Sequence, residues 1–489
     1  MPPNIILIMT DQQRADSIGA LGAPWMQTPH IDRLVAEGTA FTNCFVTSPV
    51  CVGARASLFN GMYPHATGIF SNFQPWKPNW VQWLADAGYH CASIGKMHIN
   101  PYDELGGFHQ RFPVENKDRP LFLEEHDRAF YDEWDKALFA RKLVKPSRYT
   151  RLAEDREGFL NALGCFDWPI DEDMHPDFFI GDTATWCLED RKAESPLFLQ
   201  IGFPGPHPPY DPVRRYLDAY ADADIPVPAV GADELAGQPP MHAALRQNMI
   251  DYNIDSVVWH ENPTGEELLR LRRHYAANVT MIDEKVGQIM EVLQRRGYLD
   301  DAVVIFTSDH ADALGDHGHI QKWTMYDTVT RVPLVVWSPG RAAAGQVCDG
   351  LVQLMDIAPT VLDAASVSVP DRWEAKSLMP MLQPNGDSHA IRDVVYSELG
   401  RDHIQPHSEY LVMRRDRDWK IVYYLGEEAG ELYDLNADPS EVRNLWNQSD
   451  HRELRERLLR ELMEWSVAGM HRGGLSEGRK PQAPLRITK

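Results

Sequence analysis

The sequence lacks several features that would define other classes of protein. No hydrophobic run approaches the roughly 20 apolar residues of a membrane-spanning helix, and there is no long low-complexity tract. The six cysteines are dispersed, without CxxC pairs or zinc-like spacing. Positive charge is scarce, because 48 lysines and arginines stand against 71 acidic residues, for a formal net charge of −23. We therefore expect no membrane and no nucleic-acid partner, since binding a polyanion needs a basic face.

What the sequence does contain is typical of a large globular protein. It has 489 residues, of which 43% are hydrophobic and 24% charged, enough for one large core and a smaller appended unit. The first apolar run, Ile5–Met9, is too short for a secretion signal and has no basic residues before it. We expect a cytoplasmic protein with reduced thiols.

Strand-like and helix-like patterns alternate along most of the chain. Short, continuous apolar runs of the kind buried in parallel sheets occur at 5–9, 90–95, 197–203, 303–307 and 334–337. Helical patterns lie near 28–38, 79–87, 178–193, 265–296 and 356–365. This alternation predicts an α/β domain with a mostly parallel sheet.

Changes of texture divide the chain into three predicted parts. Residues 1–384 form the large domain, with irregular insertions near 101–175 and 204–265. Residues 385–466 contain short, partly alternating strands and a helix near 451–465, which suggests a small α+β subdomain. Residues 467–489 are rich in glycine and proline, and we expect this tail to contact a neighbouring subunit of a homo-oligomer.

Two of the predicted strands run directly into acidic residues. Asp11-Gln12 follows the first strand, and Asp309-His310 follows the strand at 303–307. Ligands gather at the carboxyl ends of strands in open α/β sheets. Two carboxylates, an amide oxygen and an imidazole suit one divalent cation. Taken alone, either pair is more often a helix cap or a turn than a metal site.

The segment around Cys51 adds a further signal. Cys51-Val-Gly-Ala-Arg55, followed by Ser57 and Gly61, resembles the sequence at which sulfatases carry their modified cysteine. A lone cysteine is more often a small buried hydrophobe. Other segments resemble the same family in the same order: Asn4–Asp11, Thr28–Gly38, Gly95-Lys96-Met97-His98, Pro206-His207-Pro208-Pro209, Phe306–His310 with Gly315–Gly318 and Lys322, and Glu431–Pro439 with Asn444-Leu445. The chain thus resembles the sulfatase family of the alkaline phosphatase superfamily over residues 4–445.

This resemblance implies a fold, cofactors and residue roles. The implied fold is an alkaline-phosphatase-like α/β structure: a mixed, mostly parallel sheet between helices, with a smaller C-terminal antiparallel sheet plus helix. In the family, a formylglycine-generating enzyme oxidises the cysteine to formylglycine, whose hydrated form attacks the ester and becomes covalently sulfated. The implied metal ligands are Asp11, Gln12, Asp309, His310 and an oxygen of modified Cys51.

The other implied roles concern the substrate. Arg55 and Lys96 would hold the hydrated formylglycine, and His98 would be the base that expels sulfate. His207 and Lys322, together with Lys96, would bind the oxygens of a small anionic ester and assist the leaving alcohol. We expect His317 and His319 to be loop or supporting residues that take no direct part in catalysis.

Three positions depart from the usual family pattern. Gly53 stands where proline or alanine is usual, Gln12 where the first metal pair usually has aspartate, and His310 where the second often has asparagine. An imidazole ligand favours Mn²⁺ over Ca²⁺, which remains possible. The two predicted ligand pairs, Asp11-Gln12 and Asp309-His310, also resemble those of phosphonate monoester and phosphodiester hydrolases. Three hypotheses follow: a sulfatase for aryl or small alkyl sulfates, a phosphonate monoester or phosphate diester hydrolase using the same site, or a silent metal-binding relative if Cys51 stays a thiol.

Overall fold

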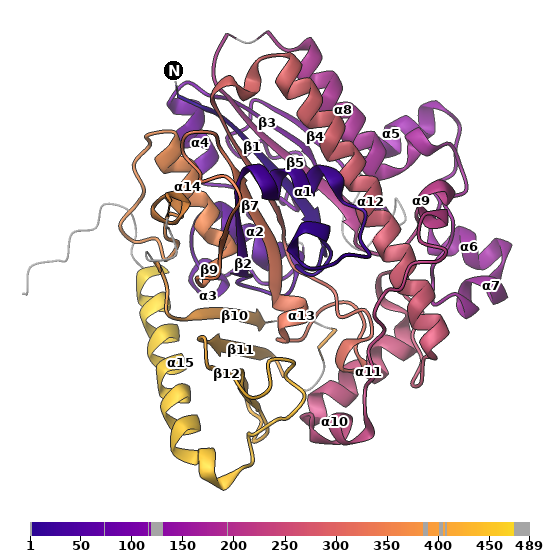
Figure 1. Cartoon of the computed structure of the whole chain (residues 1–489), viewed down its shortest axis with the longest axis vertical. Coiled ribbons are helices and arrows are strands. Elements are labelled where there is room, and N and C mark those ends of the chain that lie inside the picture. The colour runs from indigo at the N-terminus through magenta and orange to yellow at the C-terminus, as the bar shows by residue number, and fades with distance from the viewer. Residues whose placement is uncertain are drawn as a thin grey trace, which may run out of the picture.

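The computed structural model describes residues 2–72, 74–115, 117–118, 131–192, 194–384, 390–400, 404–405 and 408–473. These residues form a large α/β domain, with a small antiparallel sheet and a long helix packed against one end of it (Figure 1). None of the described helices is long and apolar enough to cross a bilayer.

The described residues of the large domain build one sheet of nine strands: β1 (Asn4–Asp11), β2 (Thr39–Phe45), β3 (His90–Gly95), β4 (Gln110–Pro113), β5 (Leu197–Pro206), β6 (Ala302–Ser308), β7 (Arg331–Trp337), β8 (Gln346–Cys348) and β9 (Val352–Gln353). The strand order is β4-β3-β5-β1-β6-β7-β2-β8, and β9 pairs with β2. Strand β7 is antiparallel to both of its neighbours, whereas the remaining pairs are parallel.

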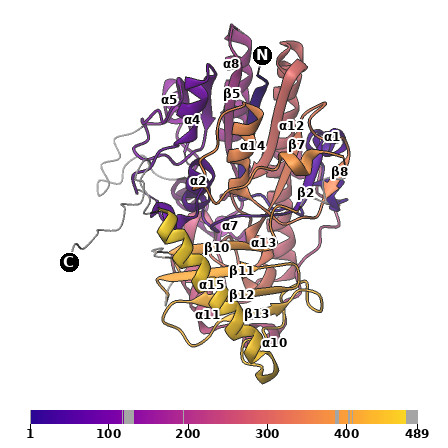
Figure 2. The ribbon, with the colours of Figure 1, turned by 90° about the vertical axis from the view of Figure 1, so that its left-hand side faces the viewer.

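Helices cover both faces of this sheet. One face carries α1 (Pro29–Glu37), α8 (Pro176–Asp190) and α12 (Gly265–Arg295), and the other carries α2 (Cys51–Asn60), α4 (Trp80–Asp86) and α14 (Ile357–Ala364). Figure 2 shows α2 and α4 on the opposite side of the sheet from α1 and α12. The apolar run of β1 serves both faces, because Ile5 and Leu7 pack into one core and Ile6 and Ile8 into the other.

The two insertions contain short helices, contrary to the irregular structure that we expected. The first holds α5 (Glu133–Ala140), α6 (Arg148–Glu154) and α7 (Arg156–Asn161), and the second holds α9 (Arg214–Asp218), α10 (Ala232–Gly237) and α11 (Pro240–Tyr252). Most of them are too short for a clear 3.6-residue period, so the sequence pattern does not reveal them. Two further short helices are α3 (Pro64–Thr67) and α13 (Asp327–Thr330).

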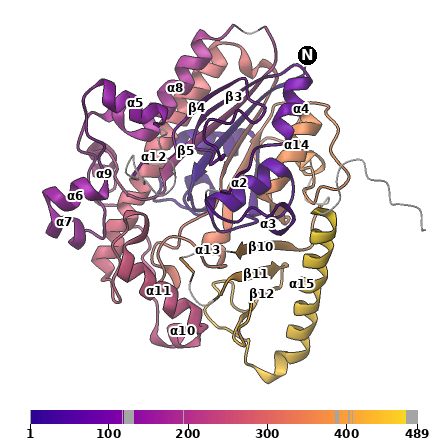
Figure 3. The ribbon, with the colours of Figure 1, turned by 180° about the vertical axis from the view of Figure 1, so that it is seen from behind.

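The C-terminal unit is the predicted antiparallel sheet with a helix. Its strands are β10 (Val395–Gly400), β11 (Tyr410–Arg415), β12 (Trp419–Tyr424) and β13 (Glu431–Asp434), in that order. Helix α15 (Arg452–Gly473) lies along this sheet and reaches α3 of the large domain, as Figure 3 shows from behind. The fold class predicted from the sequence is confirmed.

Helix α15 continues past its predicted end near 465 into the start of the predicted tail. Trp465 stacks on Tyr396 with ring centroids 4.3 Å apart, and Gly469 lies against the ring of His65. This packing outweighs the poor helix propensity of glycine. The rest of the predicted tail, 474–489, and the predicted domain boundary at 385 lie outside the described residues.

Candidate active site

The ends of two neighbouring strands bring the predicted acidic residues together. Strands β1 and β6 are parallel, with Thr10 opposite Ser308, so Asp11 and Asp309 emerge side by side. Both carboxylates are fully buried. The backbone N–H of Gln12 donates a hydrogen bond to Oδ1 of Asp309, at 3.2 Å. The shared edge that the sequence predicts for these residues is therefore present in the structure.

Cys51 is the first residue of α2 and faces these strand ends. Its Sγ lies 3.1 Å from Nε2 of His310 and 3.7 Å from Oδ1 of Asp11. Ligand atoms of Asp11, Cys51, Asp309 and His310 all lie within 4.8 Å of one another. The Nδ1 atom of His310 is 3.1 Å from the carbonyl oxygen of Ala311, which can only accept. Nδ1 therefore carries the proton, and Nε2 is the nitrogen left to bind a metal.

Three cations surround this cluster. Arg55, one turn after Cys51 on α2, places Nε 2.7 Å from Oδ2 of Asp309 and Nη2 3.2 Å from Oδ2 of Asp11. Lys96, just after β3, has its Nζ 2.8 Å from the same Asp11 oxygen. The Nζ of Lys322 lies 3.4 Å from Sγ of Cys51 and 3.3 Å from Oε1 of Gln12. Three buried cations this close together suit a pocket for an anion.

The charges shift the pKa values of the cluster in different directions. Burial raises the pKa of Asp11, but Lys96, His207, His310 and Arg55 together hold it well below its ordinary value. Burial and the neighbouring Asp11 raise the pKa of Asp309 to about 6, although Arg55 opposes them.

The thiol of Cys51 is also perturbed. Burial and Asp11 raise its pKa, yet Lys322, Lys96 and His310 outweigh them and lower it well below the ordinary value for cysteine. Residue 51 thus occupies an electropositive position in which a negatively charged nucleophile is stabilised.

A small cavity of about 80 Å³ opens onto Cys51. It is lined by the predicted catalytic residues Cys51, Lys96, His98, His207 and Lys322. All ten predicted site residues lie in this cavity or in the cluster beneath it. The two histidines expected to have no direct duty lie elsewhere: His317 contacts Glu234, and His319 contacts His242.

Three carboxylates at the site were not predicted. Oε2 of Glu115 lies 3.1 Å from Nδ1 of His98, and Oδ2 of Asp255 lies 3.6 Å from Nε2 of His207. Asp312 accepts a hydrogen bond from Nε2 of Gln12 at 2.6 Å. Asp312 is visible in the sequence as an acid two residues after His310, whereas Glu115 and Asp255 lie within the insertions, where no periodic pattern marks them.

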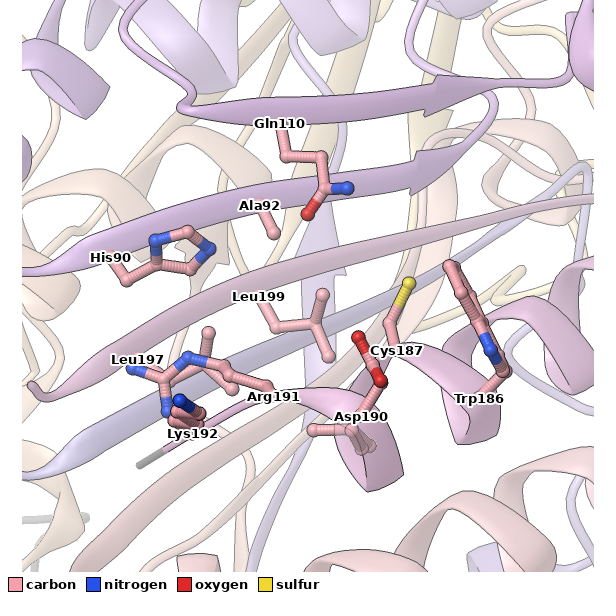
Figure 4. A pocket seen from close by; sticks show the side chains of 11 residues that line it. His90, Ala92, Gln110, Trp186, Cys187, Asp190, Arg191, Lys192, Leu197 and Leu199 are labelled. Atoms are coloured by element: carbon pink, nitrogen blue, oxygen red, sulfur yellow. The ribbon is translucent and has the colours of Figure 1, made fainter. Parts of the chain in front are cut away.

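A second, larger cavity of about 330 Å³ lies between α8 and strands β3, β4 and β5 (Figure 4). It contains none of the predicted site residues. It does contain a cysteine, Cys187, but burial and Asp190 raise the pKa of that thiol to about 12. Arg191 and Lys192 line this cavity, but the cluster of metal-ligand atoms found around Cys51 is not part of it.

The donor set at Cys51 fits a divalent cation. It combines two carboxylates, an imidazole with its nitrogen oriented for binding, and residue 51, and Gln12 directs its amide oxygen towards the same cavity. This set lies at the carboxyl edge of a mixed sheet between helices, beside a small antiparallel sheet. The fold and the site define an alkaline-phosphatase-like hydrolase.

Comparisons with known proteins narrow the class. The sulfatase family model matches residues 3–367, and the model of the N-sulphoglucosamine sulphohydrolase C-terminal region matches residues 315–468. The chain belongs to the sulfatase family.

Individual relatives agree with this assignment. The chain is 30% identical to an arylsulfatase of Clostridium perfringens, covering 94% of this chain and 95% of that protein. It is also 30% identical to a choline-sulfatase of Rhizobium meliloti, covering 91% and 82%. The solved structure of a phosphonate monoester hydrolase of Agrobacterium radiobacter superposes with a TM-score of 0.76 at 25% identity, covering 96% of each chain. The family therefore makes the chain a hydrolase of the sulfatase class.

Proposed function

We propose that this enzyme hydrolyses sulfate monoesters of aryl or small alkyl alcohols, using a formylglycine made from Cys51. The observation that carries the proposal is the position of Cys51, buried at the start of α2 within 4.8 Å of the ligand atoms of Asp11, Asp309 and His310. A hydrated formylglycine at this position would attack the ester and pass through a covalent sulfated form of residue 51.

The metal ligands would be Asp11, Gln12, Asp309, His310 and an oxygen of residue 51. A bound divalent cation would supply Lewis acidity, lowering the pKa of a hydroxyl and drawing charge from the ester. We favour Mn²⁺ over Ca²⁺, because an imidazole ligand is more typical of transition metals than of calcium.

The remaining residues would act on the two ends of the ester. Arg55 and Lys96 are tied to each other through the Lys96 carbonyl, at 2.7 Å from Nη1 of Arg55, and would orient the nucleophile. Lys322 and His207 also line the cavity, and they would hold the ester oxygens and assist the leaving alcohol. His98 would remove the proton whose loss releases sulfate.

A second candidate function is hydrolysis of phosphonate monoesters or phosphate diesters in the same site. The Asp-Gln and Asp-His pairs and the structural likeness to a phosphonate monoester hydrolase favour it. All three ester types carry one negative charge on a tetrahedral centre, so one pocket can accommodate each of them.

The test begins with the chemistry of residue 51. Enzyme from a host that supplies a formylglycine-generating enzyme is digested, and the Cys51 peptide is weighed; we expect the mass of formylglycine. Turnover of matched 4-nitrophenyl sulfate and phenylphosphonate esters then separates the two functions, with Cys51→Ala as inactive reference and Cys187→Ala as the cysteine control. A plain thiol in a fully active enzyme would contradict the proposal.

A further inference from the structure

The backbone of His98 adopts a conformation that few side-chain-bearing residues adopt. Its φ is +64°, in the left-handed region, three residues after β3 ends. Two side chains bind the strained residue. The His98 N–H donates to Oε2 of Glu115 at 3.0 Å, and the indole Nε1–H of Trp76 donates to the His98 carbonyl at 2.7 Å. Such strain at a site residue indicates that its orientation matters for function.

The same oxygen of Glu115 also contacts the His98 ring. Oε2 lies 3.1 Å from Nδ1, so a single carboxylate oxygen binds both the backbone and the side chain of His98. An ionised carboxylate can only accept hydrogen bonds, so Nδ1 must carry a proton. In a neutral ring the lone pair is then on Nε2, which is the nitrogen able to take a proton.

Glu115 is itself firmly placed and charged. It is buried, and its backbone N–H donates to Oδ2 of Asp132 at 3.0 Å, at the start of α5 in the first insertion. Burial raises the pKa of Glu115, but the hydrogen bond and charge of His98, with Arg111 nearby, bring it below its ordinary value. The first insertion therefore places a negative charge beside Nδ1 of His98.

We propose that Glu115 is a positioning residue for His98, fixing the Nδ1–H tautomer and stabilising the imidazolium that forms when sulfate is released. This inference rests on the proposed function. In that step, Nε2 of His98 takes the proton of the hydroxyl that does not carry sulfate. The electrons of that O–H bond form the aldehyde C=O, the carbon–oxygen bond to sulfate breaks, and its electron pair leaves with the sulfate dianion. Glu115 offsets the positive charge that the ring gains.

The central experiment is a double-mutant cycle on 4-nitrophenyl sulfate. Glu115→Gln keeps the size of the side chain but removes its charge, and we expect kcat to fall about 10- to 100-fold with KM unchanged or lower. Pre-steady-state mixing should show a burst of 4-nitrophenol of one equivalent per modified site, because attack on the ester is spared and sulfate release is slowed. In a His98→Asn background, Glu115→Gln should cost nothing further.

A matched control is Glu104→Gln, which removes one negative charge from the same insertion without a contact to His98. It should leave kcat and the burst unchanged. If Glu115→Gln does not fold, Glu115→Asp takes its place in the cycle, with a smaller loss of kcat and again no further loss beside His98→Asn. Losses that add in the double variant, or a loss confined to KM, would overturn the proposal.

A spectroscopic measurement tests the interaction between Glu115 and His98 without relying on turnover. In enzyme with ¹⁵N-labelled histidine, the His98 resonances are assigned by their absence in His98→Asn. We expect a proton on Nδ1 in the wild type, and loss of that preference in Glu115→Gln. A wild type that does not turn over sulfate esters would contradict the proposed function, while a proton confined to Nε2 would contradict the role of Glu115.

Discussion

Gly53 lies so close to Ser48 that no side chain fits between them. A Cβ atom built on Gly53 would lie 2.6 Å from Oγ of Ser48 and 2.8 Å from its Cβ. Gly53 is the third residue of α2, and Ser48 is a buried residue just before that helix. Close packing of the segment that carries Cys51 thus accounts for glycine at a position where sulfatases usually have proline or alanine.

We predict that Gly53→Ala destabilises the folded enzyme by about 1–3 kcal/mol, the usual cost of overpacking a close-packed site. Ser48→Gly in the same chain should restore most of this loss, because it removes both clashing atoms. Urea unfolding of the single and double variants measures the effect. Gly265→Ala, at the open start of α12, is the control and should change stability little. A Gly53→Ala variant as stable as the wild type would show that Ser48 yields easily.

A buried histidine of the large domain, His319, predicts sensitivity to acid. Nε2 of His319 lies 2.8 Å from Nδ1 of His242 and 3.3 Å from Nη1 of Arg246, which can only donate. Burial, followed by the charges of His242, Arg246 and His317, lowers the pKa of His319 well below 6.5. The unfolded chain therefore takes up a proton below about pH 6.5 that the folded protein resists, so stability falls as the pH falls.

Replacing His319 should remove this part of the acid sensitivity. We expect His319→Gln to lose less stability than the wild type between pH 7.5 and pH 5.5, measured by urea unfolding at both pH values. His471→Gln, at an exposed position of α15, should behave like the wild type. An equal acid-induced loss in His319→Gln and wild type would assign the sensitivity to other groups.

The sequence predicts the parts of this molecule that depend on local pattern. The apolar run of β1 and the long amphipathic α12 are both predictable, because a parallel strand buried on both faces gives a continuous apolar run, whereas a helix buried along one stripe gives a 3.6-residue period. Asp11 and Asp309 were foreseen for a related reason, since residues that follow adjacent parallel strands must meet. The positions of Arg55, Lys96, His207 and Lys322 required the resemblance to sulfatases.

Contacts between distant, irregular segments were not foreseeable. Glu115 follows the short edge strand β4, and Asp255 follows α11, within stretches that have no regular hydrophobic period. Their partners, His98 and His207, are 17 and 48 residues away in the sequence, so only tertiary packing brings them together. The later end of α15 has the same origin, because Trp465 packs on Tyr63 and His65 of the large domain and Gly469 lies against His65.

Asp312 offers a test of how Gln12 is held as a metal ligand. Asp312 accepts from Nε2 of Gln12 at 2.6 Å and so fixes Oε1 on the side of Lys322. We expect Asp312→Asn to weaken Mn²⁺ binding about 10- to 100-fold, as is usual when a residue that orients a ligand is replaced. Titration of the metal-free enzyme with Mn²⁺ measures the affinity.

The control for this prediction removes a different hydrogen bond to the same oxygen of Asp312. Tyr210 donates its hydroxyl to Oδ2 of Asp312, at 2.6 Å, and Tyr210→Phe leaves this carboxylate available to Gln12. Tyr210→Phe should therefore bind Mn²⁺ more tightly than Asp312→Asn does. Unchanged affinity in Asp312→Asn would mean that Gln12 keeps its orientation without the carboxylate, or that it is not a ligand.

Asp255 predicts a dependence on the leaving alcohol. Nδ1 of His207 lies 2.8 Å from the carbonyl oxygen of Pro208 and must donate to it, while Nε2 is 3.6 Å from Oδ2 of Asp255. Burial, Lys322 and Lys96 lower the pKa of His207, whereas Asp255 opposes them and favours the protonated ring. Removing the carboxylate should therefore weaken donation of a proton to the departing oxygen.

We expect Asp255→Asn to reduce kcat/KM about 10- to 100-fold for alkyl sulfates, whose alkoxide leaving groups need a proton. The loss should be much smaller for 4-nitrophenyl sulfate, because 4-nitrophenolate leaves unaided. A series of aryl sulfates with leaving groups of rising basicity measures the slope, which should be steeper in the variant. Asp251→Asn, an exposed carboxylate at the end of α11, is the charge control and should leave the slope unchanged. A uniform loss across the series would instead place Asp255 in substrate binding, because weaker binding lowers every rate alike.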